Sequence, residues 1–138
     1  VRYTDSGSDL VHMVIEFGGG KRREFRPNPA VRLVPTTATP GTTWSYTLTS
    51  TDGSTTIAVV SKVVGTERIT GGGKTVDTVV LEVKLDTKTP ELTRTETRTI
   101  WWSPKYRLMV KGHEVSEGDQ AGFHVRSEAD TTIRSLDP

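Results

Sequence analysis

Apolar and polar residues alternate with a period of two along most of this chain. Alternation of this kind predicts β-strands that bury one face and expose the other. No segment shows apolar residues at helical spacing over three turns, although residues 114–120 and 127–136 could each hold a helical turn in spite of poor propensities. We therefore expect an all-β protein with little or no helix.

The N-terminal part predicts a hairpin followed by a crossing segment. Leu10–Phe17 is expected as a strand, Gly18–Lys21 as a turn and Arg22–Arg26 as a short return strand. Glycine suits such a turn because it reaches positive φ without steric cost. Residues 27–41 contain four prolines, which cannot donate to a ladder, so this segment predicts an extended crossing with one short strand. The same segment is the one candidate boundary inside the chain.

From residue 42 onward the pattern predicts long strands joined by hairpins. They are expected over residues 42–49, 55–64, 75–85, 93–102, 106–113 and 121–133. The second of these strands is expected to break at Gly65 and to continue over residues 67–70. Asp52-Gly53 favours a type I′ turn between the first two. Eight to ten strands in hairpin order form an antiparallel meander, which must curl or close to protect its edges. We expect a curved half-barrel or an open barrel, as a single domain over residues 1–138.

The composition agrees with such a sheet. Of the 138 residues 23 are Thr and 16 are Val, both of which favour strands, while hydrophobic residues make up only 33%. Most Thr residues fall opposite the apolar ones, and the row Thr93, Thr95, Thr97 and Thr99 is expected on a solvent-facing surface. The low apolar share is therefore that of a sheet with one wet face, and little apolar material is left to cover the other face.

Charge and residue content exclude several classes of function. The formal net charge of +1 argues against a nucleic-acid partner, because modules that bind nucleic acid usually carry a basic excess. No run of 18 apolar residues is present, so no transmembrane segment is expected. Since the chain has no cysteine, it has no disulfide, thiol nucleophile or cysteine-based zinc site.

Other candidate catalytic and metal-binding groups are scattered. His12, His113 and His124 lie on separate predicted strands without the spacing of metal ligands. No serine occupies a Gly-x-Ser-x-Gly elbow, and residues 72–75 match only the last part of a phosphate-binding loop. Glu82 and Glu96 could form a carboxylate pair, but exposed ion pairs with Arg94, Arg98 or Lys84 are the better interpretation. We expect no enzyme, no metal and no cofactor.

Aromatic side chains are the strongest indication of a binding surface. Trp44, Tyr46 and Leu48 alternate on one face of a predicted strand, whereas the adjacent Trp101 and Trp102 must point to opposite faces. One of these two tryptophans is expected in the core, and the other must be covered by a loop, a ligand or a partner. The predicted ligand-binding set is Trp44, Tyr46, Leu48, Trp101, Trp102 and Leu108. The alternative is that these side chains only fill the core.

Residues 41–113 contain four motifs in a recognisable order. They are Gly41-Thr42-Thr43-Trp44, Val63-Val64-Gly65-Thr66-Glu67, the segment 73–80 that begins Gly73-Lys74-Thr75, and the segment 99–108 that contains Trp101-Trp102-Ser103-Pro104. This order resembles the curved antiparallel sheets of bacterial envelope proteins similar to lipoprotein carriers, with Arg107 where their last motif has a glycine. The resemblance implies a half-barrel with one concave apolar face, which in the carriers holds acyl chains.

The location of the protein has weaker indications. The chain begins at Val1 without a signal-peptide pattern, so we expect Val1 to be a mature end or a boundary within a longer chain. The absence of cysteine and the abundance of Thr and Gly fit a cell-envelope or secreted protein, and they also fit a cytosolic one. The cell envelope or secretion is the favoured location.

The sequence is consistent with two main functions. The favoured one is a non-catalytic envelope module that binds an apolar or amphipathic, lipid-like ligand, or a protein partner, on a concave sheet face. The alternative is a structural or interaction domain of a larger surface protein with a filled core, and an enzyme comes third. A concave cavity larger than about 300 Å³ would distinguish the first from the second. Ligand identity, partner and oligomeric state are left open.

Overall fold

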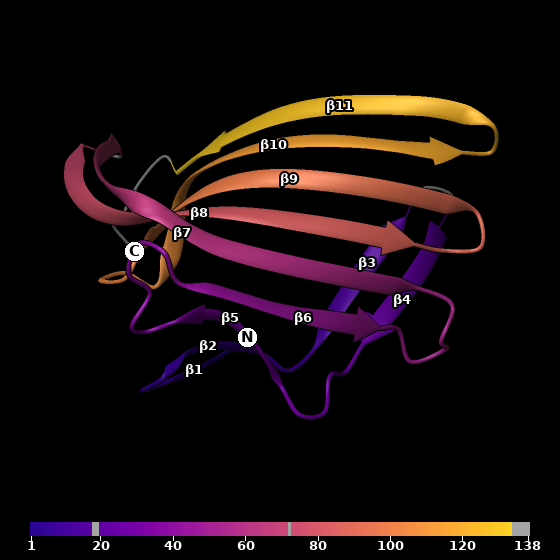
Figure 1. The fold of residues 1–138 in the computed structure, drawn as a ribbon, viewed down its shortest axis with the longest axis horizontal. Helices are drawn as coiled ribbons and strands as arrows, with labels where there is room; N and C mark the ends of the chain where they lie inside the picture. Colours follow the sequence, from indigo (N-terminus) through magenta and orange to yellow (C-terminus); the bar gives the residue numbers. More distant parts are fainter. Residues whose placement is uncertain (18–19, 72, 134–138) are drawn as a thin grey trace.

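A computed structural model describes residues 1–17, 20–71 and 73–133, and confirms the all-β prediction (Figure 1). Its strands are β1 (Arg2–Thr4), β2 (Gly7–Leu10), β3 (Met13–Phe17), β4 (Lys21–Phe25), β5 (Val31–Pro35), β6 (Thr43–Thr49), β7 (Thr56–Gly71), β8 (Lys74–Lys88), β9 (Leu92–Ser103), β10 (Leu108–Gln120) and β11 (Phe123–Thr132). Within the described residues, no helix has the length and apolar character needed to cross a membrane.

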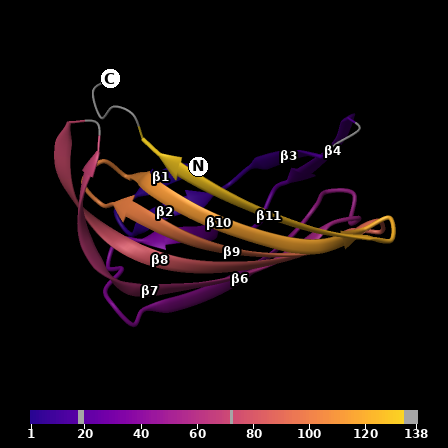
Figure 2. The same ribbon diagram turned by 90° about the horizontal axis from the view of Figure 1, so that it is seen from above.

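The largest sheet is the predicted antiparallel meander. Its strand order is β11-β10-β9-β8-β7-β6, so each strand is hydrogen-bonded to its neighbours in the sequence. The sheet curves, and its concave side faces the N-terminal strands (Figure 2). In the described part of the chain β6 and β11 are the two edges and do not pair with each other, so the sheet does not close into a barrel.

The N-terminal strands form two small units on the concave side. Strands β1, β2 and β5 make a three-stranded sheet, and β3 pairs with β4 in the predicted hairpin, whose glycine turn lies in part outside the described residues. The single strand expected over Leu10–Phe17 is wrong, because β2 ends at Leu10 and β3 begins at Met13. The chain changes sheets at this point, since β2 pairs with β5 and not with β4.

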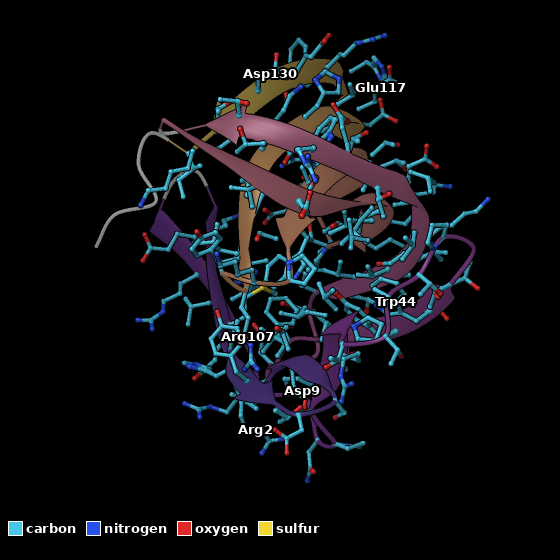
Figure 3. The ribbon with its side chains drawn as sticks, turned by 90° about the vertical axis from the view of Figure 1, so that its left-hand side faces the viewer. Arg2, Asp9, Trp44, Arg107, Glu117 and Asp130 are labelled. Carbon is cyan, nitrogen blue, oxygen red and sulfur yellow. The ribbon has the colours of Figure 1, made fainter. Side chains whose placement is uncertain are left out.

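A buried carboxylate holds the three-stranded sheet together. Asp9 is 7% exposed and its Oδ1 accepts a hydrogen bond from Arg32 Nε of β5 at 2.5 Å. Arg2 Nη2 of β1 approaches the other carboxylate oxygen at 3.7 Å, and Figure 3 shows Arg2 and Asp9 together at this end of the molecule. Burial of the charge is tolerated because cations of both neighbouring strands compensate it.

Two apolar clusters connect these units to the large sheet. In the first, Leu10 and Phe25 pack with Leu48, Ile57 and Val59 of β6 and β7. The second joins Val34 of β5 to buried residues of β7 and β8, namely Val63, Val79 and Leu81. Residues on both sides of the proline-rich segment 27–41 therefore contribute to the same core.

Strand β7 shows how alternation produces one dry and one wet face. Val59 and Val63 are 2% and 0% exposed on the concave side, whereas Val60 is 54% exposed on the convex side. The break expected at Gly65 is a register shift between Val63 and Gly65 within one continuous strand. Such a bulge adds a residue to one strand and increases the local twist.

The last two strands correct the expectation of helical turns. Residues 114–120 belong to β10, which pairs with β9 on one side and β11 on the other. Residues 127–132 belong to β11, and residues 134–136 lie outside the described part of the chain. Ladder hydrogen bonds on both sides of β10 outweigh its weak local preferences.

The turn between β6 and β7 differs from the type I′ turn that Asp52-Gly53 predicts. The β6–β7 turn is not type I′, because Gly53 has a φ of 70° while Asp52 is not among the residues with positive φ. The Asp52 carboxylate instead fixes the loop by accepting hydrogen bonds from Ser50 Oγ at 2.6 Å, Ser54 N at 3.0 Å and Ser54 Oγ at 2.8 Å. Side-chain hydrogen bonds of this kind are an alternative to a tight backbone turn.

The two faces of β7 allow a matched test of the fold. Val63→Thr keeps the side-chain shape and the strand preference but places a hydroxyl in a site that is 0% exposed. We expect the free energy of unfolding to fall by about 1–3 kcal/mol, the cost of a buried hydroxyl without a partner. Val60→Thr on the convex face should change it by less than about 0.5 kcal/mol in urea denaturation. Equal effects of the two variants would contradict the assignment of faces.

The Asp52 turn makes a pH-dependent contribution to stability. Hydrogen bonds from Ser50 and Ser54 lower the pKa of Asp52 from 3.8 to about 2 in the folded protein. Because the folded pKa is lowered, this contribution is present above pH 3.8 and is lost as the pH falls through about 2. We expect a carboxyl NMR titration of Asp52 with a midpoint near 2, and a smaller loss of stability on acidification for Asp52→Asn. An unshifted midpoint would show that these hydrogen bonds are not formed in solution.

Candidate functional site

A cavity of about 440 Å³ lies between the concave face of the large sheet and the N-terminal strands. One wall is formed by the N-terminal units, with Leu10, Met13, Ile15 and Leu33. The opposite wall belongs to the sheet, and its apolar members are Tyr46, Leu48, Ile57, Val59, Leu85 and Leu92. The volume lies within the range of about 300–1,000 Å³ that is typical of ligand pockets.

Strand register explains why the sheet wall is apolar. Leu48 of β6 is opposite Ile57 of β7, and Tyr46 is opposite Val59, so all four side chains share the concave face. Val59 is in turn opposite Leu85 of β8, which continues the same row. Burial raises the pKa of the Tyr46 hydroxyl above its ordinary value of 10.0, against a smaller lowering by Arg98. Tyr46 is therefore a neutral hydrogen-bonding group in this wall.

The wall changes from apolar to charged at β9. Leu85 is opposite Glu96, and the residues on either side of Glu96 at the same face are Arg94 and Arg98. The alternate positions Thr93, Thr95 and Thr97 are exposed on the convex face, as predicted from the threonine row, and Thr99 is half-buried. The charged side chains of β9 thus point into the concave side of the molecule.

Arg94, Glu96 and Arg98, together with Glu114 of β10, form a closed ring of ion pairs. Glu96 Oε1 accepts hydrogen bonds from Arg94 Nη2 at 3.1 Å and from Arg98 Nη2 at 2.9 Å. Glu114 completes the ring, with Oε1 3.4 Å from Arg94 Nη2 and Oε2 2.9 Å from Arg98 Nε. Two cations and two anions balance each other at this end of the cavity.

The ring differs from the exposed ion pairs expected from sequence. Glu96 is only 7% exposed, whereas Arg94 and Arg98 are half-buried. Glu82 cannot pair with Glu96, because Glu82 is opposite Thr99 and lies on the other face of the sheet. The Nε atoms of both arginines are buried without a hydrogen bond of acceptable geometry. The ring is therefore a partly desolvated charge cluster, in which Glu96 is the buried member, beside an apolar cavity.

The predicted binding residues are divided among several places. Tyr46 and Leu48 line the 440 Å³ cavity, while Trp44 packs against the second core cluster. Leu108 is half-buried and is not among the residues that line this cavity. Trp101 and Trp102 point to opposite faces, as expected for neighbours on a strand.

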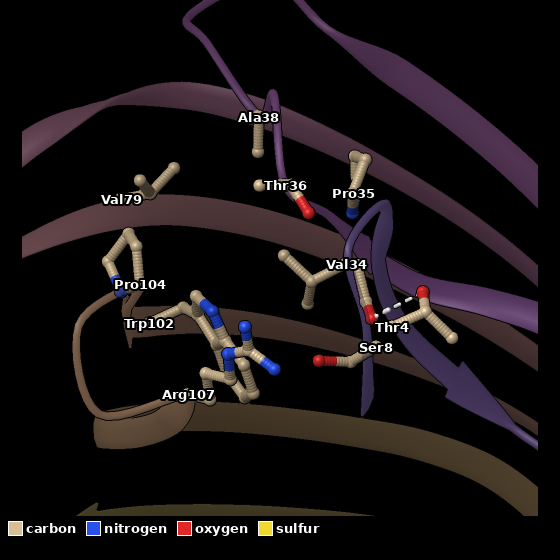
Figure 4. A pocket seen from close by; sticks show the side chains of 11 residues that line it. Thr4, Ser8, Val34, Pro35, Thr36, Ala38, Val79, Trp102, Pro104 and Arg107 are labelled. Carbon is tan, nitrogen blue, oxygen red and sulfur yellow. Dashed lines mark hydrogen bonds between the residues drawn. The ribbon is translucent and has the colours of Figure 1, made fainter. Parts of the chain in front are cut away.

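The two tryptophans have different surroundings. Trp101 is covered by its own chain, because its Nε1 donates to Glu67 Oε2 at 2.6 Å and Lys111 Nζ lies 4.3 Å from the ring centre. Trp102 lines a smaller cavity of about 100 Å³, where Figure 4 shows it beside Arg107 and opposite Val34. That volume is below the size of a typical ligand pocket.

Arg107 closes the turn between β9 and β10 next to this small cavity. Its φ is 53°, in the left-handed region that glycine favours. Its guanidinium lies 5.9 Å from the centre of the Tyr3 ring, and its carbonyl accepts a hydrogen bond from the Tyr3 hydroxyl at 3.5 Å. Glycine would adopt this φ without strain. The arginine present instead contacts Tyr3 of β1, which a glycine side chain could not do.

A third hollow, of about 480 Å³, lies at the twisted ends of β7 and β8. Five of its seven lining residues are polar or charged types, including the exposed pair Arg68 and Asp77, whose Nε and Oδ1 atoms are 2.9 Å apart. It therefore lacks the convergent apolar walls of the 440 Å³ cavity, which is the better candidate site.

The histidines are paired at the surface. His12 contacts Glu24 at 2.9 Å, His113 contacts Asp130 at 2.9 Å, and His124 contacts Asp119 at 3.0 Å. In the ranges that the structure describes, no three His, Asp or Glu side chains are grouped so that they could hold a metal ion. His113 and His124 therefore belong to cross-strand pairs of β10 and β11, whereas His12 precedes β3 and contacts Glu24 of β4.

Residues from the N-terminal wall were missed as site residues. Alternation predicts Met13 and Ile15 on one face of a strand. No pattern in the residues indicates that this face packs over the sheet formed by residues 43–103. The ring had a clearer signal, because Arg94, Glu96 and Arg98 share a face with the apolar Ile100. Charged residues in line with core residues indicate a polar patch on a buried face.

Comparison of the chain with protein-family models, curated proteins and solved structures finds no match. The resemblance to lipoprotein carriers therefore stays a prediction, and the site is interpreted from its own geometry.

The ion-pair ring can be tested by a substitution that removes one of its charges and keeps the size of the side chain. Glu96→Gln retains the side-chain shape but removes the charge that Arg94 and Arg98 share. We expect a loss of about 1–3 kcal/mol in the free energy of unfolding, because two half-buried cations each lose the buried carboxylate that they share. Their partial exposure to solvent keeps the loss below that of a fully buried pair.

Glu82→Gln is the matched control, since Glu82 is exposed on the convex face of the neighbouring strand. It should change the free energy of unfolding by less than about 0.5 kcal/mol in the same urea denaturation. If Glu96→Gln were as mild as the control, the ring would not contribute to the fold.

Proposed function

We propose that this protein is a non-catalytic binding module that holds an amphipathic, lipid-like molecule in its concave cavity. The observation that carries the proposal is the cavity itself, about 440 Å³ between two apolar walls with a ring of charges at one end. A filled structural domain would have no such space on this face. A location in the cell envelope or outside the cell agrees with this function and is part of the proposal.

The apolar walls select the body of the ligand. Leu, Ile, Val and Met side chains offer no hydrogen bonds to water, so solvent in this space is poorly held. An apolar chain that displaces this water gains roughly 25 cal/mol for each Å² of apolar surface removed from solvent. An acyl or other hydrocarbon chain has the required chemistry.

The charged ring selects the other end of the ligand. A guanidinium group has five N–H donors, and the two ring carboxylates use only part of those of Arg94 and Arg98. Both arginines are half-buried, so donors at the rim remain accessible to an oxygen of the ligand head. The ring has no net charge, which favours a polar head with hydrogen-bond acceptors over one that needs a strong counter-charge.

An enzyme has little support in this geometry. No histidine, serine or lysine is found among the described residues that line the cavity. The two carboxylates of the cavity are each occupied by two arginines, which leaves no free general base there. The groups present are suited to binding and positioning.

Ligand binding can be measured directly with two probes of equal chain length. Palmitate and monopalmitoylglycerol, each below its aggregation threshold, are titrated into the protein labelled at its Leu, Ile, Val and Met methyl groups. We expect one site per chain and NMR shifts concentrated at Met13, Ile57 and Leu85. Comparison of the two probes shows whether the ring prefers a neutral or an anionic head.

A cavity-filling variant with a matched control tests the location of the site. Leu85→Trp fills the space from the sheet wall and should weaken binding by at least about tenfold, which corresponds to about 1.4 kcal/mol. Val60→Trp places the same side chain on the convex face of β7 and should leave the affinity unchanged. Met13→Trp, from the opposite wall, repeats the test independently.

Binding that survives both filling variants, in proteins that retain their methyl spectra, would place the ligand elsewhere. No binding of either probe, together with a clean ligand-free mass for protein purified from its own host, would favour the structural alternative.

A further inference from the structure

Strand β11 is a long edge of the large sheet, and no element among the described residues covers it. All of its ten residues are exposed, including Phe123 at 73% and Val125 at 53%. It pairs with β10 from Gln120↔Phe123 to Lys111↔Thr132 without a register shift. Natural edge strands are usually protected by a bulge, a proline, short length or charged side chains, and of these features β11 has only the charges.

The backbone groups on the open side of β11 can be identified. The β10–β11 turn consists of Ala121 and Gly122, both with positive φ (50° and 82°), which is typical of a two-residue type I′ hairpin whose closing pair is hydrogen-bonded. Hydrogen-bonded pairs then recur at every second residue from Phe123 onward, and Ile133 N does donate to Val110 O at 2.9 Å. Odd-numbered residues therefore face β10, and residues 124, 126, 128, 130 and 132 present their N–H and C=O groups to solvent.

The side chains at these even positions carry an ordered set of charges. Along the convex face the order is His124, Arg126, Glu128 and Asp130, so the basic residues precede the acidic ones. Figure 3 shows Asp130 at the rim of the molecule, away from the N-terminal strands. An antiparallel copy of this strand presents the opposite order, which makes the edge complementary to itself.

We propose that β11 pairs antiparallel with β11 of a second copy of this chain, with the two Ser127 residues facing each other on a two-fold axis. This register places Arg126 opposite Glu128 of the second copy and His124 opposite Asp130 of the second copy. The two-fold axis repeats each pair, so the interface contains four pairs of opposite charge type. The result is a continuous twelve-stranded sheet.

Other registers either lose the ladder hydrogen bonds between the two strands or place like charges opposite each other. A shift by one residue would place outward-facing groups opposite inward-facing ones and lose the ladder hydrogen bonds. A shift that centres Arg126 sets it opposite its own copy, and a shift that centres Glu128 does the same for that residue. Like charges directly opposite each other on neighbouring strands are destabilising. The register centred on Ser127 avoids both defects.

Contacts within each chain extend the alternation of charge across the interface. Arg126 Nη1 lies 3.1 Å from Glu117 of β10, so it would stand between two carboxylates. His124 likewise contacts Asp119 and would gain Asp130 of the second copy as a further neighbour. On the concave face Val125 would be opposite Ala129 of the second copy, which reduces the apolar surface exposed at the tip of β11.

Sedimentation of the full chain over a concentration series tests the dimer. We expect a species of twice the chain mass, and a dimer dissociation constant raised by at least about tenfold in Glu128→Arg, because the two-fold axis repeats each repulsive pair. The double variant R126E/E128R exchanges the charges and should recover most of the affinity. The control Arg68→Glu reverses a charge in the exposed pair with Asp77, which belongs to β7 and β8 and is outside the proposed interface, and should remain dimeric.

Disulfide cross-linking tests the register, since the chain has no other cysteine. Ser127→Cys places two thiols in a non-hydrogen-bonded pair, where Cα atoms are about 4.5 Å apart and a disulfide can form. Ala129→Cys would leave the two thiols about 13 Å apart, beyond the reach of a disulfide. Oxidation should therefore link the first variant and not the second.

A monomer at all concentrations overturns the proposal, and so does a dimer that Glu128→Arg leaves intact. Cross-linking of Ala129→Cys at the rate of Ser127→Cys would overturn the register. None of these outcomes depends on whether the concave cavity binds a lipid, because β11 does not line it.

Discussion

Burial of the concave face of the six-stranded sheet is the constraint on which the other features of this molecule depend. Strands β6, β7 and β8 direct Leu48, Val59, Leu81 and their neighbours to that face, and the sheet cannot cover them itself. The cover comes from the chain that precedes the sheet, through Leu10 and Phe25 in one cluster and Val34 in the other. The gain from removing this apolar surface from water holds the small N-terminal units in place.

The cover is thin and incomplete, and this explains both the cavity and the free edge. Only 33% of the residues are hydrophobic, and the two N-terminal units are too small to fill the space beneath a curved sheet. The covered area ends where β9 changes from apolar residues to the Arg94–Glu96–Arg98 row. Beyond that row β10 and β11 have little to bury, so all residues of β11 are exposed, and no described strand pairs with its outer edge. The cavity and the edge are therefore consequences of the same shortage of apolar material.

Local pattern was a good guide to the strands and a poor guide to their partners. Alternation located most of the large sheet, including the turns expected at residues 51–54 and 103–105, because the period of two is a property of each strand alone. It failed at residues 114–120, where two neighbouring ladders stabilise a strand that has weak local preferences. It also failed at Val11 and His12, where the chain leaves one sheet for another. In the site it found Tyr46 and Leu48, but it could not join them to Met13, which lies on a separate unit.

The residues alone define an all-β chain, a Thr-rich wet face, an apolar opposite face and the charges that interrupt it on β9, because each follows from side-chain order along a strand. The tertiary structure alone decides that the N-terminal strands cover this face, that Glu96 becomes buried between two arginines, and that a space of about 440 Å³ remains. These features arise from contacts between segments far apart in the chain. Their energies depend on packing and desolvation in three dimensions, which residue order does not encode locally.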